Sequence, residues 1–354
     1  MVVFYNKYRP KTFEQIFGQE TVVKILTTAI EKNRISHSYL FTGPKGTGKT
    51  STARILAKSI NCAGENKPCL KCENCNNLSD LIELDAASHR GVDDIEKVIN
   101  DCRFVPTFGN KKIYVLDELH MLSPTAFNAL LKTLEEPPSH AIFILCTTEY
   151  HKVLETIRSR CINLTFKKFN NSEICKYLEY ICQQENIPYE KEAIEILAER
   201  SSSSIRDALN LLESVQDDIS FNRVCEEFHI VGDKLLIQFS YTFLMKKEIE
   251  CLTILNKFVY NGGDIKSLVR DTIEFLRIVN LCYADETGEL ASMLSTDRRY
   301  KLANSLAKRI EDFSLIKDAI IHLYNIQWKD SDLDPINVEV GIIEHCSLME
   351  GVKG

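Results

Sequence analysis

The stretch Ser38-Tyr-Leu-Phe-Thr-Gly-Pro-Lys-Gly-Thr-Gly-Lys-Thr-Ser-Thr-Ala-Arg-Ile-Leu-Ala-Lys-Ser59 decides the fold of this chain. Its apolar start, Tyr39-Leu40-Phe41, predicts a short buried strand, and an amphipathic helix is expected to begin near Lys49. The turn between them matches the phosphate-binding pattern G-x-x-x-x-G-K-[ST] over residues 43–50. A chance glycine-rich loop is the alternative, but the position between a strand and a helix favours a nucleotide-binding α/β domain.

Each part of this turn has a chemical role in holding a phosphate. Glycine lets the backbone N–H groups curl around phosphate oxygens without interference from a Cβ atom, and the helix start adds the positive end of its dipole. Lys49 is expected to reach the β- and γ-phosphates of ATP, and the Thr50 hydroxyl is expected to bind Mg²⁺. The residues expected to contact the nucleotide here are Gly43, Pro44, Lys45, Gly46, Thr47, Gly48, Lys49, Thr50 and Ser51.

The composition limits the class of protein. With 354 residues, of which 44% are hydrophobic and 26% charged, the chain is long enough for two or three domains of a soluble globular protein. Its net charge of −7 argues against coating nucleic acid through an overall field, so DNA binding would need local basic sites. The sequence shows neither an apolar stretch of membrane-spanning length nor a signal-peptide pattern, so we expect a cytoplasmic protein without membrane partners.

Four of the 13 cysteines stand at ligand spacing after the expected phosphate-binding helix, at Cys62, Cys69, Cys72 and Cys75. The stretch around them is too polar to form a core, so four unrelated buried thiols are a poor explanation. Four thiolates that converge on one tetrahedral cation predict a structural Zn²⁺ site, which has no open coordination position for catalysis. An iron–sulfur cluster is the alternative, because similar spacings occur in ferredoxins, although nothing else in the sequence calls for electron transfer.

A strand is predicted at residues 80–86, and a further, buried strand, Ile-Tyr-Val-Leu-Asp-Glu, at residues 113–118, where it ends in two carboxylates. Asp117 can support the Mg²⁺ shell, and Glu118 can orient or deprotonate the attacking water. Another apolar run, residues 142–148, ends in two threonines whose hydroxyls can sense the γ-phosphate beside these carboxylates. His120 follows the acidic pair, but a single histidine at a helix start is more often a structural hydrogen-bonding residue. We therefore leave it outside the expected site.

Two arginines further along the chain each allow two interpretations. Arg160 precedes a strand expected at residues 162–166, and it either pairs with a surface carboxylate or supplies charge to a nucleotide on an adjacent subunit. Arg206 lies in the first turn of an expected helix, where a positive charge is unfavourable unless an anion is near; a plain surface arginine is the alternative. From about residue 167 the pattern is entirely helical, and the region after residue 220 predicts a packing or oligomerisation domain.

Alternating strands and helices followed by a small helical domain resemble a P-loop ATPase of the AAA+ class. Asp117-Glu-Leu-His-Met-Leu-Ser123, Phe127-Asn-Ala-Leu-Leu-Lys-Thr-Leu-Glu-Glu-Pro-Pro138 and Ser159-Arg-Cys161 together resemble clamp-loader ATPases. The four-cysteine module beside an intact phosphate loop is similar to the bacterial DNA polymerase III gamma/tau family. The resemblance is dense over residues 5–215 and architectural beyond. It implies an AAA+ domain over 1–166 with a zinc module at 62–75, a helical lid over 167–222 and an all-helical collar over 223–354.

This resemblance also implies a role for individual residues. It makes Thr148 the first sensor, Arg160 the finger that acts in trans on a neighbouring subunit, and Arg206 the second sensor that contacts the γ-phosphate in cis. It supports Lys49, Thr50, Asp117 and Glu118 in the roles given above, Tyr8, Arg9 and Pro10 as an arm near adenine, and Cys62, Cys69, Cys72 and Cys75 as zinc ligands.

The activity implied is DNA-dependent hydrolysis of ATP to ADP and phosphate within the DNA polymerase III holoenzyme, without nucleotidyl transfer. ATP at subunit interfaces would hold copies of this chain with delta and delta-prime subunits in a spiral. That spiral would grip the sliding clamp (beta) and primer–template DNA, and hydrolysis would release the clamp. DNA contacts are expected near Arg90 and at Lys132.

Two other functions remain open from the sequence: a non-hydrolysing scaffold that uses nucleotide to order an assembly, and another AAA+ motor such as a branch-migration helicase. The chain also ends at Gly354, just after a helical region, whereas longer tau forms carry further C-terminal domains. It therefore resembles a short gamma-type core, a shortened piece or a reduced homologue, and the sequence does not choose among them.

Overall fold

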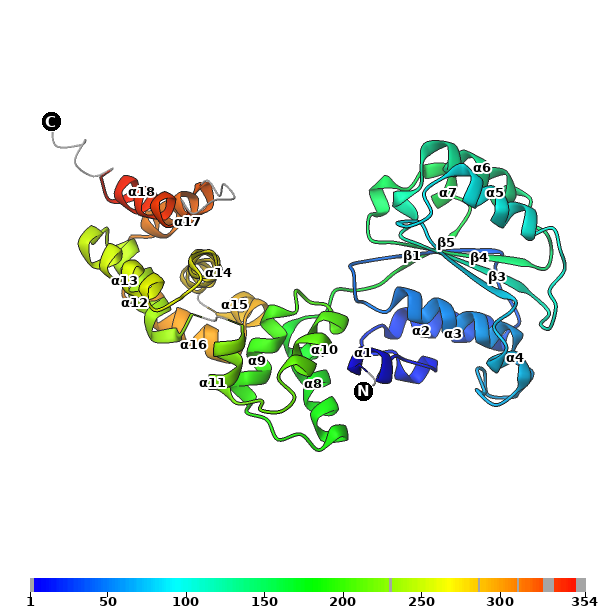
Figure 1. Cartoon of the computed structure of the whole chain (residues 1–354), viewed down its shortest axis with the longest axis horizontal. Coiled ribbons are helices and arrows are strands. Elements are labelled where there is room, and N and C mark those ends of the chain that lie inside the picture. Colours follow the sequence, from blue (N-terminus) through cyan, green and yellow to red (C-terminus); the bar gives the residue numbers. More distant parts are fainter. Residues whose placement is uncertain (1–2, 229–230, 286, 311, 327–333, 348–354) are drawn as a thin grey trace. The chain divides into compact units, whose positions relative to one another are not determined.

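The computed structural model of the chain describes residues 3–228, 231–285, 287–310, 312–326 and 334–347. These residues form two compact units (Figure 1). The first unit contains residues 1–169 and 203–210, and the second contains residues 170–202 and 211–354. The division into three domains that the sequence suggested remains a prediction.

A five-stranded parallel sheet forms the centre of the first unit, with the strand order β2-β3-β4-β1-β5. Because every pair is parallel, the carboxyl ends of the strands lie at one edge, where Asp85 is level with Asp117 and Thr42 with Thr147. That edge is where α/β proteins bind ligands. The strands are β1 (Ser38–Thr42), β2 (Leu81–Asp85), β3 (Lys112–Asp117), β4 (Ala141–Thr147) and β5 (Ile162–Thr165).

Helices cover both faces of this sheet (Figure 1). Side chains alternate along each strand, so Ile113 and Val115 pack on the face that carries α2 (Glu20–Glu31) and α3 (Lys49–Asn61). Tyr114 and Leu116 pack on the other face. The helices of that other face are α5 (Val92–Asp101), α6 (Pro124–Glu135) and α7 (Glu155–Arg158). The buried parallel strands that the apolar runs predicted are confirmed.

Short elements connect the strands and helices of the first unit. One helical turn, α1, lies in the N-terminal lead-in, where the sequence predicted no helix. Another, α4, lies within the four-cysteine stretch, and η2 follows the two carboxylates at the end of β3. Their bounds are α1 (Phe4–Lys7), η1 (Phe13–Gln15), α4 (Glu73–Asn76), η2 (Leu119–Met121) and η3 (Tyr150–Lys152).

The described part of the second unit is helical apart from one isolated bridge, as the pattern after residue 167 predicted. Its first helix starts with a capping box, in which Asn170 and Glu173 satisfy each other's backbone N–H groups. Helix α10 begins in the first unit. The helices are α8 (Asn171–Glu185), α9 (Lys191–Arg200), α10 (Ile205–Ser214), α11 (Phe221–Glu227), α12 (Asp233–Leu244), α13 (Glu248–Tyr260), α14 (Ile265–Ala284), α15 (Glu289–Leu294), α16 (Asp297–Ala307), α17 (Ser314–Asn325) and α18 (Asp334–Ser347).

Charged side chains are buried between helices of the second unit. Arg200, at the end of α9, donates to Asp271 of α14 at 3.0 Å. The neighbouring Glu199 accepts the Thr296 hydroxyl at 2.7 Å and lies 3.7 Å from Arg299 Nε. Burial raises the pKa of both Glu199 and Asp271. These ion pairs join α9 to α14 and to the start of α16.

Among the residues that the structure describes, none of the helices combines the length and the apolar character needed to cross a bilayer.

Candidate functional site

The loop between β1 and α3 has a backbone that requires glycine. Gly43, Gly46 and Gly48 all have positive φ, at 146°, 75° and 97°. A Cβ atom on Gly43 would lie 2.5 Å from the Phe166 carbonyl oxygen, and one on Gly46 would lie 1.9 Å from the Ser204 hydroxyl. The glycines of the sequence pattern are therefore needed both for the turn and for the close approach of neighbouring chain segments.

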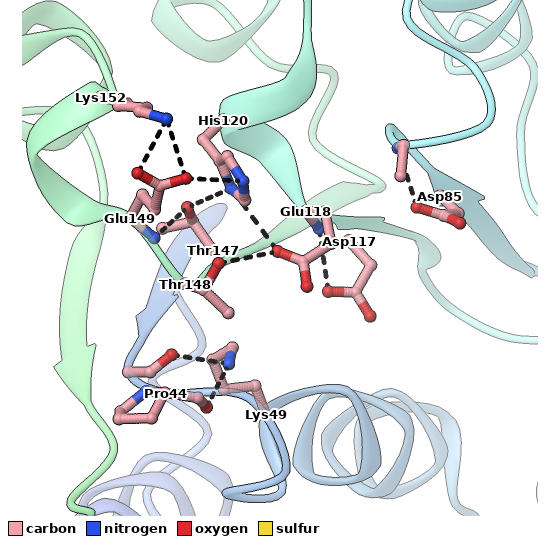
Figure 2. Close-up of polar contacts among 12 residues, drawn as sticks. Pro44, Lys49, Asp85, Asp117, Glu118, His120, Thr147, Thr148, Glu149 and Lys152 are labelled. Atoms are coloured by element: carbon pink, nitrogen blue, oxygen red, sulfur yellow. Dashed lines mark hydrogen bonds and ion pairs between the residues drawn. The ribbon is translucent and has the colours of Figure 1, made fainter. Parts of the chain in front are cut away.

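Lys49 is buried at the first position of α3, and its ammonium group points back into the loop (Figure 2). Its Nζ donates to the carbonyl oxygens of Gly43 at 2.7 Å and Pro44 at 2.8 Å. Burial lowers the pKa of Lys49. Phosphate oxygens of a bound nucleotide would compete with these two carbonyls for the N–H donors of Lys49. The side chain therefore already lies at the expected phosphate position.

The two groups expected to hold Mg²⁺ meet directly. The Thr50 hydroxyl donates to Asp117 Oδ2 at 2.5 Å, although the residues are 67 positions apart in the chain. The other oxygen, Asp117 Oδ1, accepts the Glu118 backbone N–H at 2.9 Å. A hydroxyl and a carboxylate in contact are oxygen donors of the type that Mg²⁺ binds, directly or through water.

Glu118 is held in a left-handed conformation, with φ of 48°, immediately after β3. A non-glycine residue in that region costs free energy and is concentrated at functional sites. Its Oε2 atom accepts the Thr148 hydroxyl at 3.1 Å (Figure 2). The structure thus brings together the expected water-activating carboxylate and the expected sensor hydroxyl.

The two expected arginines, Arg160 and Arg206, have different kinds of partner. Arg160 donates to Glu135 Oε1 at 2.6 Å and to the Thr156 carbonyl oxygen, so in the single chain it makes the surface ion pair that the sequence allowed. Arg206 lies over the ring of Tyr5, with Cζ 4.9 Å from the ring centroid. This cation–π contact gives the arginine in the first turn of α10 a favourable partner.

The N-terminal lead-in contacts the phosphate-binding helix. Arg9 Nε donates to Ser51 Oγ at 3.1 Å, and burial together with the nearby charge of Arg54 lowers the pKa of Arg9. Tyr8 packs edge-on against Phe4, with ring centroids 6.2 Å apart. The arm that the sequence predicted near the nucleotide is therefore tied to α3, although no described contact tests its role at adenine.

The four cysteines come together outside the sheet edge. One sulfur from each of Cys62, Cys69, Cys72 and Cys75 lies within 4.8 Å of the others, and all four thiols are free. Backbone N–H groups of Gly64 and Cys69 point at Cys62 Sγ, both at 3.3 Å. Hydrogen bonds from Lys71 and then Cys72 lower the pKa of Cys69 to about 6. Thiols gathered with N–H donors toward sulfur fit a tetrahedral metal site.

Two features of the site were not found from the sequence. His120, which the sequence left out, lies between two carboxylates at the sheet edge (Figure 2). Its position two residues after Glu118 was the available signal, but two of its partners, Thr147 and Glu149, come from the end of β4 and the loop after it. Arg54 pairs with Glu83 beside the N-terminal arm, and no sequence spacing indicated that pair.

Two segments of the chain match known protein families. Residues 18–170 match the family model described as DNA polymerase III, delta subunit, and residues 173–214 match the DNA polymerase III clamp loader subunit, ATPase lid domain. The chain is 38% identical over 268 residues to DNA polymerase III subunit gamma of Buchnera aphidicola subsp. Baizongia pistaciae, covering 73% of this chain and 72% of that protein.

The chain is also 41% identical over 360 residues to DNA polymerase III subunit tau of Bacillus subtilis. That alignment covers 97% of this chain but 62% of the relative, and the Haemophilus influenzae tau/gamma subunit is covered over 42% of its length. The chain therefore spans only part of these longer relatives.

Among solved structures, the Thermotoga maritima RuvB Holliday junction branch migration motor is similar, with a TM-score of 0.50 and 20% identity. The match covers 67% of this chain and 79% of that one. At this identity the likeness concerns the fold, and with the lid-domain match it confirms the AAA+ architecture that the sequence predicted.

Proposed function

Because this chain belongs to the family of bacterial DNA polymerase III gamma and tau subunits, we propose that it is an ATP-hydrolysing subunit of the replicative clamp loader. In this role it loads the sliding clamp onto primed DNA. The observation that carries the proposal is the meeting of Lys49, Thr50, Asp117 and Glu118 at one sheet edge. These are the parts that phosphoryl transfer to water needs.

Lys49 and the loop N–H groups bind the β- and γ-phosphates of ATP in this proposal. Lys49 leaves the carbonyl oxygens of Gly43 and Pro44 for phosphate oxygens, which is favourable because the new hydrogen bonds are charge-assisted on both sides. Thr50 and Asp117 would hold Mg²⁺, which neutralises phosphate charge when bound. The 2.5 Å contact between their oxygens fits a shared cation.

Glu118 orients the attacking water and accepts its proton. Thr148 donates to Glu118 Oε2, and it therefore fixes the direction of the carboxylate relative to the γ-phosphate position. The hydroxyl of Thr148 comes from the residue after β4, and Glu118 from the residue after β3. Since β3 and β4 are neighbours in the sheet, the strand order itself brings the sensor to the base.

Arg160 completes the active centre of a neighbouring subunit. In the single chain its side chain is about one-third exposed and is paired with an exposed carboxylate, Glu135. Surface ion pairs of this kind contribute little to stability, so Arg160 can exchange Glu135 for a phosphate at low cost. Arg206 acts on the same chain's nucleotide from its place above Tyr5.

The proposed partners are copies of this chain, delta and delta-prime subunits, the beta clamp and primer–template DNA. The exposed residues Arg90 and Lys132 are proposed to face the DNA. The proposed location is the cytoplasm.

The cysteine cluster holds structural Zn²⁺ in this proposal. Its four sulfurs would fill a tetrahedral shell and leave no open position, so the metal orders the stretch after α3 and takes no part in hydrolysis. Metal analysis of purified protein is expected to give one zinc per chain, and removing it should lower the melting temperature. Visible absorption typical of an iron–sulfur cluster, or a Cys62→Ser, Cys75→Ser protein that retains full zinc, would reject the assignment.

The proposal is tested by the ATPase rate of the assembled loader with and without clamp and primed DNA. We expect strong stimulation by both, and Arg160→Ala should lower the stimulated rate at least about a hundredfold, because an arginine acting on a neighbour's phosphate contributes this much or more. The matched control is Arg223→Ala, another surface arginine paired with a carboxylate, Glu227 at 2.8 Å. It should leave the rate unchanged.

Three results would contradict the proposal. ATP binding without any hydrolysis would support a nucleotide-dependent scaffold. Hydrolysis that branched DNA stimulates and the clamp does not would support a different motor. Full-speed hydrolysis by the isolated chain, unaffected by Arg160→Ala, would mean that no neighbour is needed.

A further inference from the structure

The ring of His120 lies between the carboxylates of Glu118 and Glu149, which follow the neighbouring strands β3 and β4 at the nucleotide edge. His120 belongs to η2, which begins directly after Glu118. Its side chain is 8% exposed. Figure 2 shows the ring between Glu118 on one side and Glu149 on the other. A nearly buried imidazole that touches the expected catalytic carboxylate calls for an explanation beyond packing.

The contacts of the ring are divided between its two nitrogens. Nδ1 lies 3.1 Å from Thr147 Oγ1 and 3.5 Å from Glu118 Oε2, and Nε2 lies 3.3 Å from Glu149 Oε1. The three partners therefore come from the residue after β3, the last residue of β4 and the second residue after β4. The imidazole joins the two strand ends that carry the proposed base and the proposed sensor.

Glu149 and Thr147, on one side of the His120 ring, have further partners of their own. Both oxygens of Glu149 lie within 2.9 Å of Lys152 Nζ, and the Glu149 backbone N–H donates to Thr147 Oγ1 at 3.1 Å. Thr147 is fully buried at the end of β4. The ring of His120 thus contacts the buried end of β4 and a carboxylate that has its own lysine partner.

On the near side, the contacts converge on a single oxygen of Glu118. Thr148 donates to Oε2, and His120 faces the same Oε2 atom. Within the described residues, the contacts of this carboxylate do not involve Oε1, which leaves that oxygen available to a water. One oxygen fixed and one oxygen available is the arrangement that orienting a nucleophile requires.

We propose that His120 is a positioning residue for ATP hydrolysis, which holds the Glu118 carboxylate against the Thr147–Glu149 strand end so that Oε1 faces the attacking water. The inference rests on the proposed ATPase function, because it assigns Glu118 to the water. His120 acts through Glu118 and does not contact the nucleotide.

The test uses the assembled loader with clamp and primed DNA. His120→Ala should lower kcat about tenfold, since a carboxylate freed from one of two anchors loses part of its orientation. Nucleotide KM, nucleotide affinity and melting temperature should stay close to the unchanged protein. His120→Asn keeps a nitrogen near the Nδ1 position and should recover much of the loss. His151→Ala, a largely exposed histidine 3.7 Å from Glu149, is the matched control and should have no effect.

Glu149→Gln changes the same contact at its other end, where the side chain is partly exposed. It therefore tests the contact even if His120→Ala impairs folding. It should lower kcat by a smaller factor, and the double variant should be no slower than His120→Ala alone, because the two residues form one chain of contacts. Additive losses, or equal losses in nucleotide affinity and kcat, would show a merely structural role and overturn the inference.

The controls separate this inference from the proposed function. If Glu118→Gln abolishes hydrolysis while His120→Ala hydrolyses at the full rate, His120 does not position the base and only the inference fails. If the unchanged protein binds ATP but does not hydrolyse it in the complete loader, the proposed function fails and the inference with it.

Discussion

Two regions of the molecule bury charged side chains to a similar depth and use them differently. Lys49 at the nucleotide edge is 5% exposed, and Asp271 between the helices of the second unit is 3% exposed. Lys49 is held by two backbone carbonyls of a glycine-rich loop, whereas Asp271 is held by the guanidinium of Arg200 at 3.0 Å. Burial alone therefore does not distinguish a binding site from a structural ion pair.

The kind of partner makes the distinction. Neutral carbonyls only partly compensate a buried ammonium, so an arriving phosphate improves the partners of Lys49 and binding is favourable. Arg200 and Asp271 already form an ion pair, and removing either one takes away the closest charged partner of the other. Lys49 is consequently available to a ligand, and the ion pairs of the second unit are committed to stability. This difference can be tested by asking which property each substitution changes.

The largest effect is expected for Lys49→Ala. It should lower ATP turnover by the assembled loader about a thousandfold, the size of effect found when one preorganised charge on a reacting group is removed. The melting temperature without nucleotide should not fall, since burial of the ammonium disfavours its charged form. Turnover and thermal unfolding measure the two properties separately. Lys58→Ala, on the same helix, is the control, and a marked loss of stability in Lys49→Ala would remove the contrast.

Asp271→Ala should show the opposite pattern. Removing the carboxylate leaves the partly buried guanidinium of Arg200 without its partner, and such losses typically destabilise by about 3 kcal/mol. Nucleotide affinity of the folded protein should be unchanged. Denaturant unfolding of the purified chain gives the free-energy difference. The control is Glu250→Ala, which removes an exposed ion pair with Lys247 and should cost less than about 1 kcal/mol. If Asp271→Ala instead reduced ATP binding, the two regions would not be independent.

The sequence predicted the local parts of the first unit and missed several pairings between distant segments. The phosphate loop and the cysteine cluster depend on short spacings, and the structure brings the four cysteine sulfurs within 4.8 Å of one another. The partners of His120 became apparent only when the strand order placed β3 beside β4. Arg200 and Asp271 are 71 positions apart, and no periodic pattern links the end of one helix to the middle of another. Arg206 was recognised as unusual, but its aromatic partner Tyr5 lies in a turn of helix that the sequence did not predict.

His345 provides the smallest test and extends the comparison to a buried histidine that forms no ion pair within the described residues. It is fully buried in α18, and its ring stacks on that of Phe243 with the centroids 4.2 Å apart. Burial, with the nearby His322, lowers the pKa of His345 to about 4.

Because the folded protein binds this proton more weakly than the unfolded chain, His345 should weaken folding as the pH falls from about 6.5 toward 4 and should have no effect above that range. His345→Phe keeps an aromatic ring against Phe243 and removes the titrating group. Its melting temperature should therefore fall less than that of the unchanged protein between pH 7 and pH 5. The exposed-histidine variant His151→Ala should keep the original pH dependence. If His345→Phe also kept the original pH dependence, the acid sensitivity would belong to other groups. Burial of the neutral His345 ring would then have no measurable effect on stability.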